Sequence, residues 1–143
     1  MANERSVAFG GNSYREHFHE LDRFDKMLET NQGPETCNSY NMLKLSKELY
    51  FRTGDTKYLD FYEKTMFNHI PSSQHPEKGG FVYFTPIRPN HYRVYSQPET
   101  SMWCCVGTGI ENHVKYGELI YTHHKNQLTV NLLVSSKLSW NGI

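Results

Sequence analysis

The sequence predicts a mainly α-helical fold that ends in a short β segment. Two adjacent stretches, residues 36–54 and 55–70, carry apolar side chains at helical spacing. Residues 126–140, NQLTVNLLVSSKLSW, alternate in polarity and are rich in β-branched side chains, which predicts one or two strands. With 143 residues, the length favours one domain that is large enough to bury a core.

The two helical stretches predict an antiparallel helix pair. Gly54 suits the end of the first helix and Asp55 suits an N-cap for the second, so the connection is very short. We expect the buried face of the first helix to contain Met42, Leu45, Leu49 and Tyr50.

The remaining elements follow from shorter patterns. A short helix is expected over 20–28, ELDRFDKML, before the turn signal NQGPE at 31–35. Residues 71–80 are expected to form a loop, and the prolines of the aromatic segment 81–100 exclude a long helix there. A further helix is expected over 109–123, just after the paired cysteines. The final strand is expected to lack a partner strand, which would fit a piece of a larger protein.

Composition and charge exclude several classes of protein. The formal net charge is zero and no helix face is basic, which argues against nucleic-acid binding. No stretch has the apolar length of a membrane span. The start, MANERSVAFGG, lacks the pattern of a signal peptide, so the default expectation is cytoplasmic, although a longer parent could be periplasmic.

The chain is rich in flat side chains, with ten Tyr, eight Phe, two Trp and eight His. Such rings usually pack a core, and they also stack against the apolar faces of sugars.

Three cysteines, Cys37, Cys104 and Cys105, cannot all pair within one chain, so a disulfide framework is a poor explanation. With Glu35 they offer three thiolates and a carboxylate, a ligand set that zinc accepts. Three buried free thiols, or a disulfide between the two adjacent cysteines, would explain the same residues. Spacing alone leaves these alternatives open.

The segment SYREHFHELDRF contains two carboxylates, Glu16 and Glu20, among His17 and His19. A carboxyl group becomes a general acid near neutral pH when burial or a nearby negative charge raises its pKa. A solvated acidic face is the simpler interpretation of the same residues.

Several motifs together resemble the β-L-arabinofuranosidase-type glycoside hydrolases of families 127 and 146. The motifs are GGNSYREHFH, GPETCNSYNMLKL, LTVNLL and the stretch from GGFVYFTPIRPN to SMWCCVGTGIENHVKYGE. The resemblance implies an (α/α)₆ barrel followed by β-sandwich domains. It implies that residues 1–124 form the back part of the barrel and that residues 125–143 begin a truncated β-sandwich.

The resemblance also implies retaining hydrolysis by a cysteine held on zinc. Cys104 matches the nucleophile of the family. Glu35, Cys37 and Cys105 match the other zinc ligands, and Cys104 completes the four. Two neighbouring thiols would then divide the work of attacking the sugar and anchoring the metal.

The remaining site residues follow from the same resemblance. Glu16 best matches the acid/base, because it follows the Gly-Gly element and precedes an aromatic residue, and Glu20 is the weaker candidate. Tyr83, in FVYFTP, resembles a tyrosine that lines the sugar site, and His17 beside Glu16 is a second candidate for substrate binding.

The implied partner is a glycan or oligosaccharide that contains arabinose. Because full members of the family are much longer, we expect a partial chain, which could self-associate through exposed barrel helices. Two alternatives to an active glycosidase remain: a non-catalytic fragment that binds zinc or sugar, and a helical interaction module with incidental cysteines.

Overall fold

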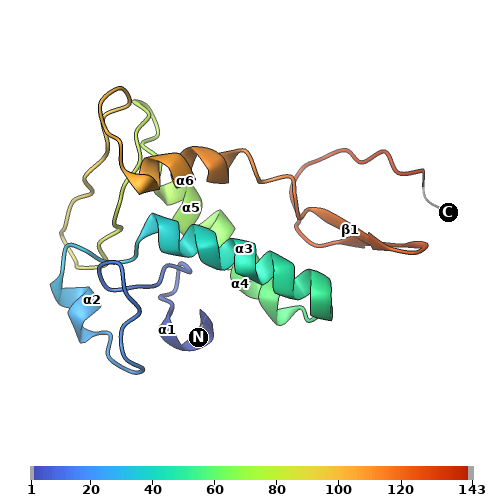
Figure 1. Cartoon of the computed structure of the whole chain (residues 1–143), viewed down its shortest axis with the longest axis horizontal. Helices are drawn as coiled ribbons and strands as arrows, with labels where there is room; N and C mark the ends of the chain where they lie inside the picture. Colours follow the sequence, from blue (N-terminus) through green and yellow to red (C-terminus); the bar gives the residue numbers. More distant parts are fainter. Residues whose placement is uncertain (1, 142–143) are drawn as a thin grey trace.

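The computed structural model describes residues 2–141 and is mostly helical, with one small antiparallel sheet (Figure 1). The mainly α prediction is therefore confirmed. In chain order the elements are α1 (Ala2–Arg5), α2 (Asp25–Glu29), α3 (Thr36–Thr53), α4 (Lys57–Phe67), α5 (His69–Ser72), α6 (Cys104–His113), β1 (Tyr121–His124) and β2 (Gln127–Val130). Among the described residues, no helix combines the length and apolarity needed to cross a membrane.

Helices α3 and α4 form the predicted pair. Gly54 follows α3 with a φ of 70°, in the left-handed region that glycine adopts at low cost. Asp55 then accepts a hydrogen bond at its Oδ1 from the backbone N–H of Lys57, at 3.0 Å. The N-cap position of α4 is nevertheless Thr56, so the predicted N-cap was placed one residue too early. The short helix before the pair is smaller than expected, since α2 spans five residues at the end of the predicted 20–28 stretch.

The buried face of α3 differs from the predicted one. Leu45 is 50% exposed, whereas Leu43 is 5% exposed and the small Ser39 and Ser46 are buried beside it. Ser39 hydrogen-bonds the buried His69 of α5, with Oγ 2.7 Å from Nδ1, so the serine-containing face of α3 faces inward. Of the four predicted residues, Met42 and Tyr50 do pack against the core, whereas Leu45 does not, so the spacing of apolar residues located the buried face only in part.

The predicted helix over 109–123 is wrong at both ends. Helix α6 begins at Cys104 and ends at His113. Residues 121–124 instead form β1, which pairs with β2 in an antiparallel register that sets Tyr121 opposite Val130 and His124 opposite Gln127. The final strand thus has a partner within the chain, contrary to expectation. The predicted strand region shrinks to Gln127–Val130, and the expected domain boundary between residues 124 and 125 falls in the turn of this hairpin.

The hydrophobic core joins the helix pair to the segments that flank the hairpin. Its buried side chains are Leu43, Phe61, Tyr62, Met66, Ile70, Leu119, Ile120 and Leu132. Several large apolar side chains stay outside this core, among them Val114 on the far end of α6 and Leu133 after the hairpin.

A buried histidine ties α5 to α3 and to the long loop. His69 is fully buried, with its ring nitrogens 2.7 Å from Ser39 Oγ and 3.1 Å from Thr85 Oγ1. Burial lowers the pKa of His69 to about 3, so the ring is neutral at physiological pH.

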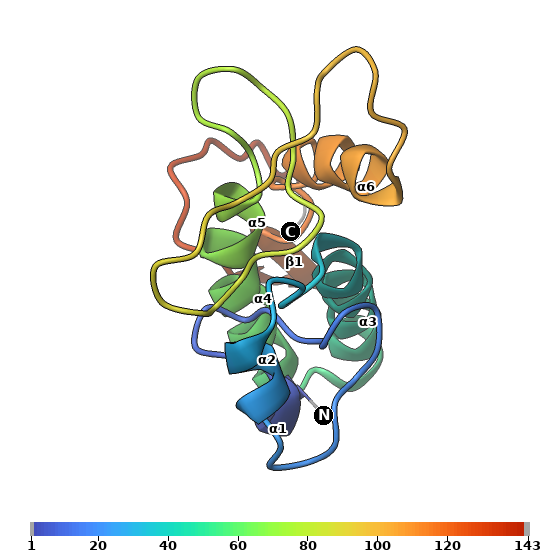
Figure 2. The same cartoon turned by 90° about the vertical axis from the view of Figure 1, so that its left-hand side faces the viewer.

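The starts of α3 and α6 lie at the same end of the molecule (Figure 1). The long loop between α5 and α6 passes over this end, and the hairpin lies at the other (Figures 1 and 2). This arrangement brings residues near 36, 83 and 104 to one place.

Candidate metal and catalytic site

A short extended pairing aligns the chain before α3 with the aromatic segment. Thr36 N–H donates to the carbonyl of Tyr83 at 3.1 Å, and Thr85 N–H donates to the carbonyl of Pro34 at 2.9 Å. Glu35 lies opposite Phe84 in this antiparallel bridge, and its N–H donates to Ser13 Oγ at 3.0 Å. These hydrogen bonds hold Glu35 and Tyr83 close together on two antiparallel segments of the backbone.

The three cysteines lie at the starts of two helices. Cys37 is the second residue of α3, and Cys104 and Cys105 are the first two residues of α6. Helix N-termini present unpaired N–H groups and a partial positive charge, which stabilise thiolates. The fold therefore gathers the thiols where two such ends meet.

Glu35, Cys37, Cys104 and Cys105, here called the Glu/Cys group, offer four ligand atoms within 4.8 Å of one another. Sγ of Cys37 lies 3.1 Å from Sγ of Cys105, which in turn lies 3.8 Å from Oε1 of Glu35. All three cysteines are free, so the alternative of a disulfide between the adjacent pair is wrong. Cys104 is exposed and the other three members are buried.

The buried members strongly perturb one another's pKa values. Burial, followed by the charge on Cys37, raises the pKa of Glu35 to about 7. The hydrogen bond with Cys105 lowers the pKa of Cys37 to about 6, and the same bond together with burial raises the pKa of Cys105. The shared hydrogen bond therefore favours the thiolate at Cys37 and the thiol at Cys105.

The donor set and its spacing fit a zinc ion. Four ligands on zinc, with Zn–S bonds of about 2.3 Å, lie roughly 3.8 Å apart in a tetrahedron. The 4.8 Å spread of the four ligand atoms needs only small side-chain adjustments to reach that geometry. Three sulfurs and one carboxylate oxygen are also ligands that suit zinc better than magnesium or calcium.

A tyrosine connects the exposed cysteine to one of the candidate acids. Sγ of Cys104 lies 3.3 Å from the hydroxyl of Tyr83, and that hydroxyl donates a short hydrogen bond to Oε1 of Glu16. These two interactions, with Cys104 and then with Glu16, raise the pKa of Tyr83. Because two consecutive hydrogen bonds join them, the Cys104 sulfur and the Glu16 carboxylate are at most about 6 Å apart.

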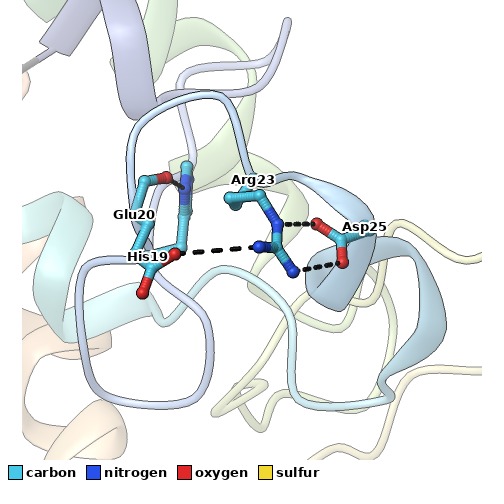
Figure 3. Close-up of polar contacts among 4 residues, drawn as sticks. All are labelled: His19, Glu20, Arg23 and Asp25. Carbon is cyan, nitrogen blue, oxygen red and sulfur yellow. Dashed lines mark hydrogen bonds and ion pairs between the residues drawn. The ribbon is translucent and has the colours of Figure 1, made fainter.

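The second candidate acid lies in a different set of contacts (Figure 3). A carboxylate oxygen of Glu20 is 3.9 Å from Nη1 of Arg23, and Nε of the same arginine is 3.1 Å from a carboxylate oxygen of Asp25. Both ring nitrogens of His19 lie near backbone carbonyl oxygens: Nδ1 is 2.7 Å from the carbonyl oxygen of Glu20, and Nε2 is 3.1 Å from that of Arg5. The contacts of Glu20 and His19 are thus with Arg23 and with backbone carbonyls rather than with the Glu/Cys group.

The other predicted substrate residue shares a hollow with Glu16. His17 and Glu16 are both exposed, and they line an open depression of about 340 Å³ together with Arg15, Gln32 and Phe84. The carboxylate and the imidazole are therefore accessible to a bound molecule.

Sequence reasoning missed one residue of the site. Oγ1 of Thr108 lies 3.1 Å from Sγ of Cys37 and donates to the carbonyl of Cys104 at 3.3 Å. Thr108 follows Cys104 by four residues, so both lie on one face of a helix that begins at the cysteine. Because the helix was expected to begin only at residue 109, this spacing carried no signal.

Comparison with known proteins gives two findings. The model of the β-L-arabinofuranosidase GH127 catalytic domain family matches residues 1–118. Among solved structures, the fold is similar to that of a GH127 β-L-arabinofuranosidase from Geobacillus stearothermophilus T6, with a TM-score of 0.68 and 21% sequence identity. The similarity covers 92% of this chain and 22% of that one, so the chain spans about a fifth of the length of that protein. The search of curated proteins returned no match.

Proposed function

Since the chain belongs to the GH127 family of β-L-arabinofuranosidases, we propose that its Glu/Cys group and Glu16 perform retaining hydrolysis of β-L-arabinofuranosides. The observation that carries this proposal is the line of contacts from the Cys104 sulfur through Tyr83 to Glu16. A nucleophile and an acid at most about 6 Å apart are close to the roughly 5–5.5 Å spacing of the two catalytic groups in retaining glycosidases.

In the first step, Sγ of Cys104 attacks the anomeric carbon while the bond to the leaving oxygen breaks. Glu16 gives its proton to that oxygen, and the sugar is left bonded to Cys104. In the second step, Glu16 takes a proton from water, the water oxygen attacks the anomeric carbon, and the carbon–sulfur bond breaks. The net reaction consumes one glycoside and one water, as hydrolysis requires.

Glu35, Cys37 and Cys105 would hold zinc together with Cys104. The bound ion would supply a positive charge that keeps the thiols deprotonated near neutral pH. Of the four ligands, Cys104 is the exposed one, so it can reach a sugar while the three buried ligands stay behind it. Tyr83 and His17 would orient the sugar, Tyr83 through its position between Cys104 and Glu16 and His17 from the hollow around Glu16.

The wider architecture belongs to the same proposal. The α3–α4 pair with α6 against it would be the back part of an (α/α)₆ barrel within residues 1–124, and residues 125–143 would begin a β-sandwich. Self-association through exposed apolar side chains such as Val114 would cover faces that these residues leave open.

The matched pair Glu16→Gln and Glu20→Gln tests the proposed acid/base. We expect Glu16→Gln to lower kcat for an aryl β-L-arabinofuranoside by about 10²–10⁴-fold, because the amide cannot give or take the proton. Glu20→Gln should leave the rate within about twofold, because that carboxylate pairs with Arg23 on the surface. The assignment fails if the two variants are equally active or if Glu20→Gln is the more impaired.

A second candidate function is the binding of zinc or sugar without catalysis. The open hollow that exposes Glu16 and His17 favours it, because water has free access to both side chains. Zinc binding without detectable release of arabinose from any arabinofuranoside would support this candidate over the hydrolase.

A further inference from the structure

A cleft of about 290 Å³ lies beside the nucleophile and is walled mostly by rings. Tyr83 and Trp103 form the side nearest Cys104, with ring centroids 6.3 Å apart. Most of the lining, these two rings included, belongs to the loop between α5 and α6, which passes over this end of the molecule (Figure 2). The full lining is Asn31, Gln32, Tyr83, Phe84, Pro86, His91, Tyr92, Val94 and Trp103.

The cleft adjoins the hollow around Glu16. Gln32 and Phe84 line both spaces, and Tyr83, which lines the cleft, donates its hydroxyl hydrogen to Glu16. In the proposed reaction, Glu16 protonates the oxygen that joins arabinose to the rest of the substrate. The part of the substrate beyond that oxygen must therefore lie on the Glu16 side of Cys104, where the cleft begins.

The side chains that line the cleft favour a neutral ligand over an acidic one. Its rings offer flat apolar faces, and its amides and imidazole offer hydrogen bonds, but the lining contains no Lys, Arg, Asp or Glu. The nearby arginines have other partners: Arg88 donates to the carbonyl of Glu29 at 3.5 Å and Arg93 to that of Ser72 at 2.8 Å. Arg15, which lines the adjoining hollow, lies over the ring of Tyr14 at 5.4 Å. A neutral ring with an apolar face and a fringe of hydroxyls fits such a wall, whereas a carboxylate would lose its water without gaining a cation.

We propose that this cleft binds the sugar residue from which arabinose is released, and that it selects a neutral sugar over an acidic one. The inference rests on the proposed function, because it takes the direction of the leaving group from Glu16. Tyr92, which is 70% exposed and edge-on to His91 at 4.9 Å, is the most accessible stacking ring of the cleft.

The first test compares substrates with and without a second ring. The probes are methyl β-L-arabinofuranoside and two disaccharides in which β-L-arabinofuranose is linked to galactose or to galacturonic acid. We expect wild-type kcat/KM to be higher for the galactose disaccharide than for the galacturonic acid one. Tyr92→Ala should lower the ratio of kcat/KM for the galactose disaccharide to that for the methyl glycoside by about fivefold. Phe51→Ala, which removes a 54% exposed ring from the far end of α3, should leave this ratio unchanged.

A second test does not depend on turnover. Because the chain has two tryptophans, Trp140→Phe leaves Trp103 as the one fluorescent indole. Free galactose should then change the Trp103 emission, with a weaker change in the Tyr92→Ala variant and a weaker change with galacturonate.

The outcomes separate the two proposals. Hydrolysis of all three substrates with a ratio that Tyr92→Ala does not alter would overturn the cleft assignment and leave the proposed hydrolase intact. A galactose-dependent change in Trp103 emission that Tyr92→Ala weakens, without hydrolysis of any substrate, would overturn the hydrolase and support the cleft as a sugar site. The cleft assignment would also be overturned if galactose left the Trp103 emission unchanged and Tyr92→Ala left the ratio of the two kcat/KM values unchanged.

Discussion

Replacing Cys104 by serine is expected to lower kcat/KM for an aryl β-L-arabinofuranoside by about a thousandfold or more. The serine hydroxyl is far less acidic than a thiol and is a weaker nucleophile, so attack on the anomeric carbon slows. The three buried members of the Glu/Cys group remain in Cys104→Ser, and zinc should therefore stay bound, although less tightly.

Met102→Ser is the matched control for this prediction. Met102 is 95% exposed and precedes Cys104 by two residues, yet it lines neither the cleft nor the hollow. It should keep wild-type kcat/KM. A Cys104→Ser variant with kcat/KM within a few-fold of wild type would contradict the role of Cys104 as nucleophile.

The second large effect is expected at a glycine of α6. A Cβ placed on Gly109 would lie 2.5 Å from Cδ1 of Phe81, and Phe81 is itself buried and stacked on His113 at 5.6 Å. Gly109→Ala should therefore lower the free energy of unfolding by about 1–3 kcal/mol, because the ring or the helix must move. Since Phe81 precedes Tyr83 by two residues, this movement should also disturb the contact between Tyr83 and Cys104.

Gly107→Ala, two residues earlier on the same helix, is the control. Nothing lies within 4 Å of a Cβ built at Gly107. Alanine restricts the unfolded chain and favours helix, so this change should raise the free energy of unfolding by about 0.5–1 kcal/mol. Denaturant unfolding of both variants measures the two effects, and a Gly109→Ala variant as stable as Gly107→Ala would contradict the packing of Phe81 on α6.

The sequence predicted the features that depend on local signals. Helical spacing on either side of Gly54 predicted the α3–α4 pair, and the glycine does adopt a left-handed conformation. The Glu35–Cys37 and Cys104–Cys105 motifs predicted a four-ligand group, and the structure brings those four ligand atoms together. Family resemblance, rather than spacing, was needed to see that motifs so far apart in the chain would meet.

Features that depend on tertiary packing were not predictable in the same way. The inward face of α3 is set by small serines such as Ser39, whose hydroxyl binds the buried His69, and apolar spacing carries no record of that contact. The strand at Tyr121–His124 exists because Gln127–Val130 folds back on it, and a residue such as Ile120 fits either a helix or a buried strand. The role of Thr108 depended on the start of α6, which the sequence placed too late.

The most direct test of the account is the zinc content of the purified protein, combined with titration of its thiols before and after chelation. We expect about one zinc per chain and three thiols that become reactive only after the metal is removed. Protein without zinc, with all three thiols reactive from the start, would contradict the claim that Glu35, Cys37, Cys104 and Cys105 form a zinc site.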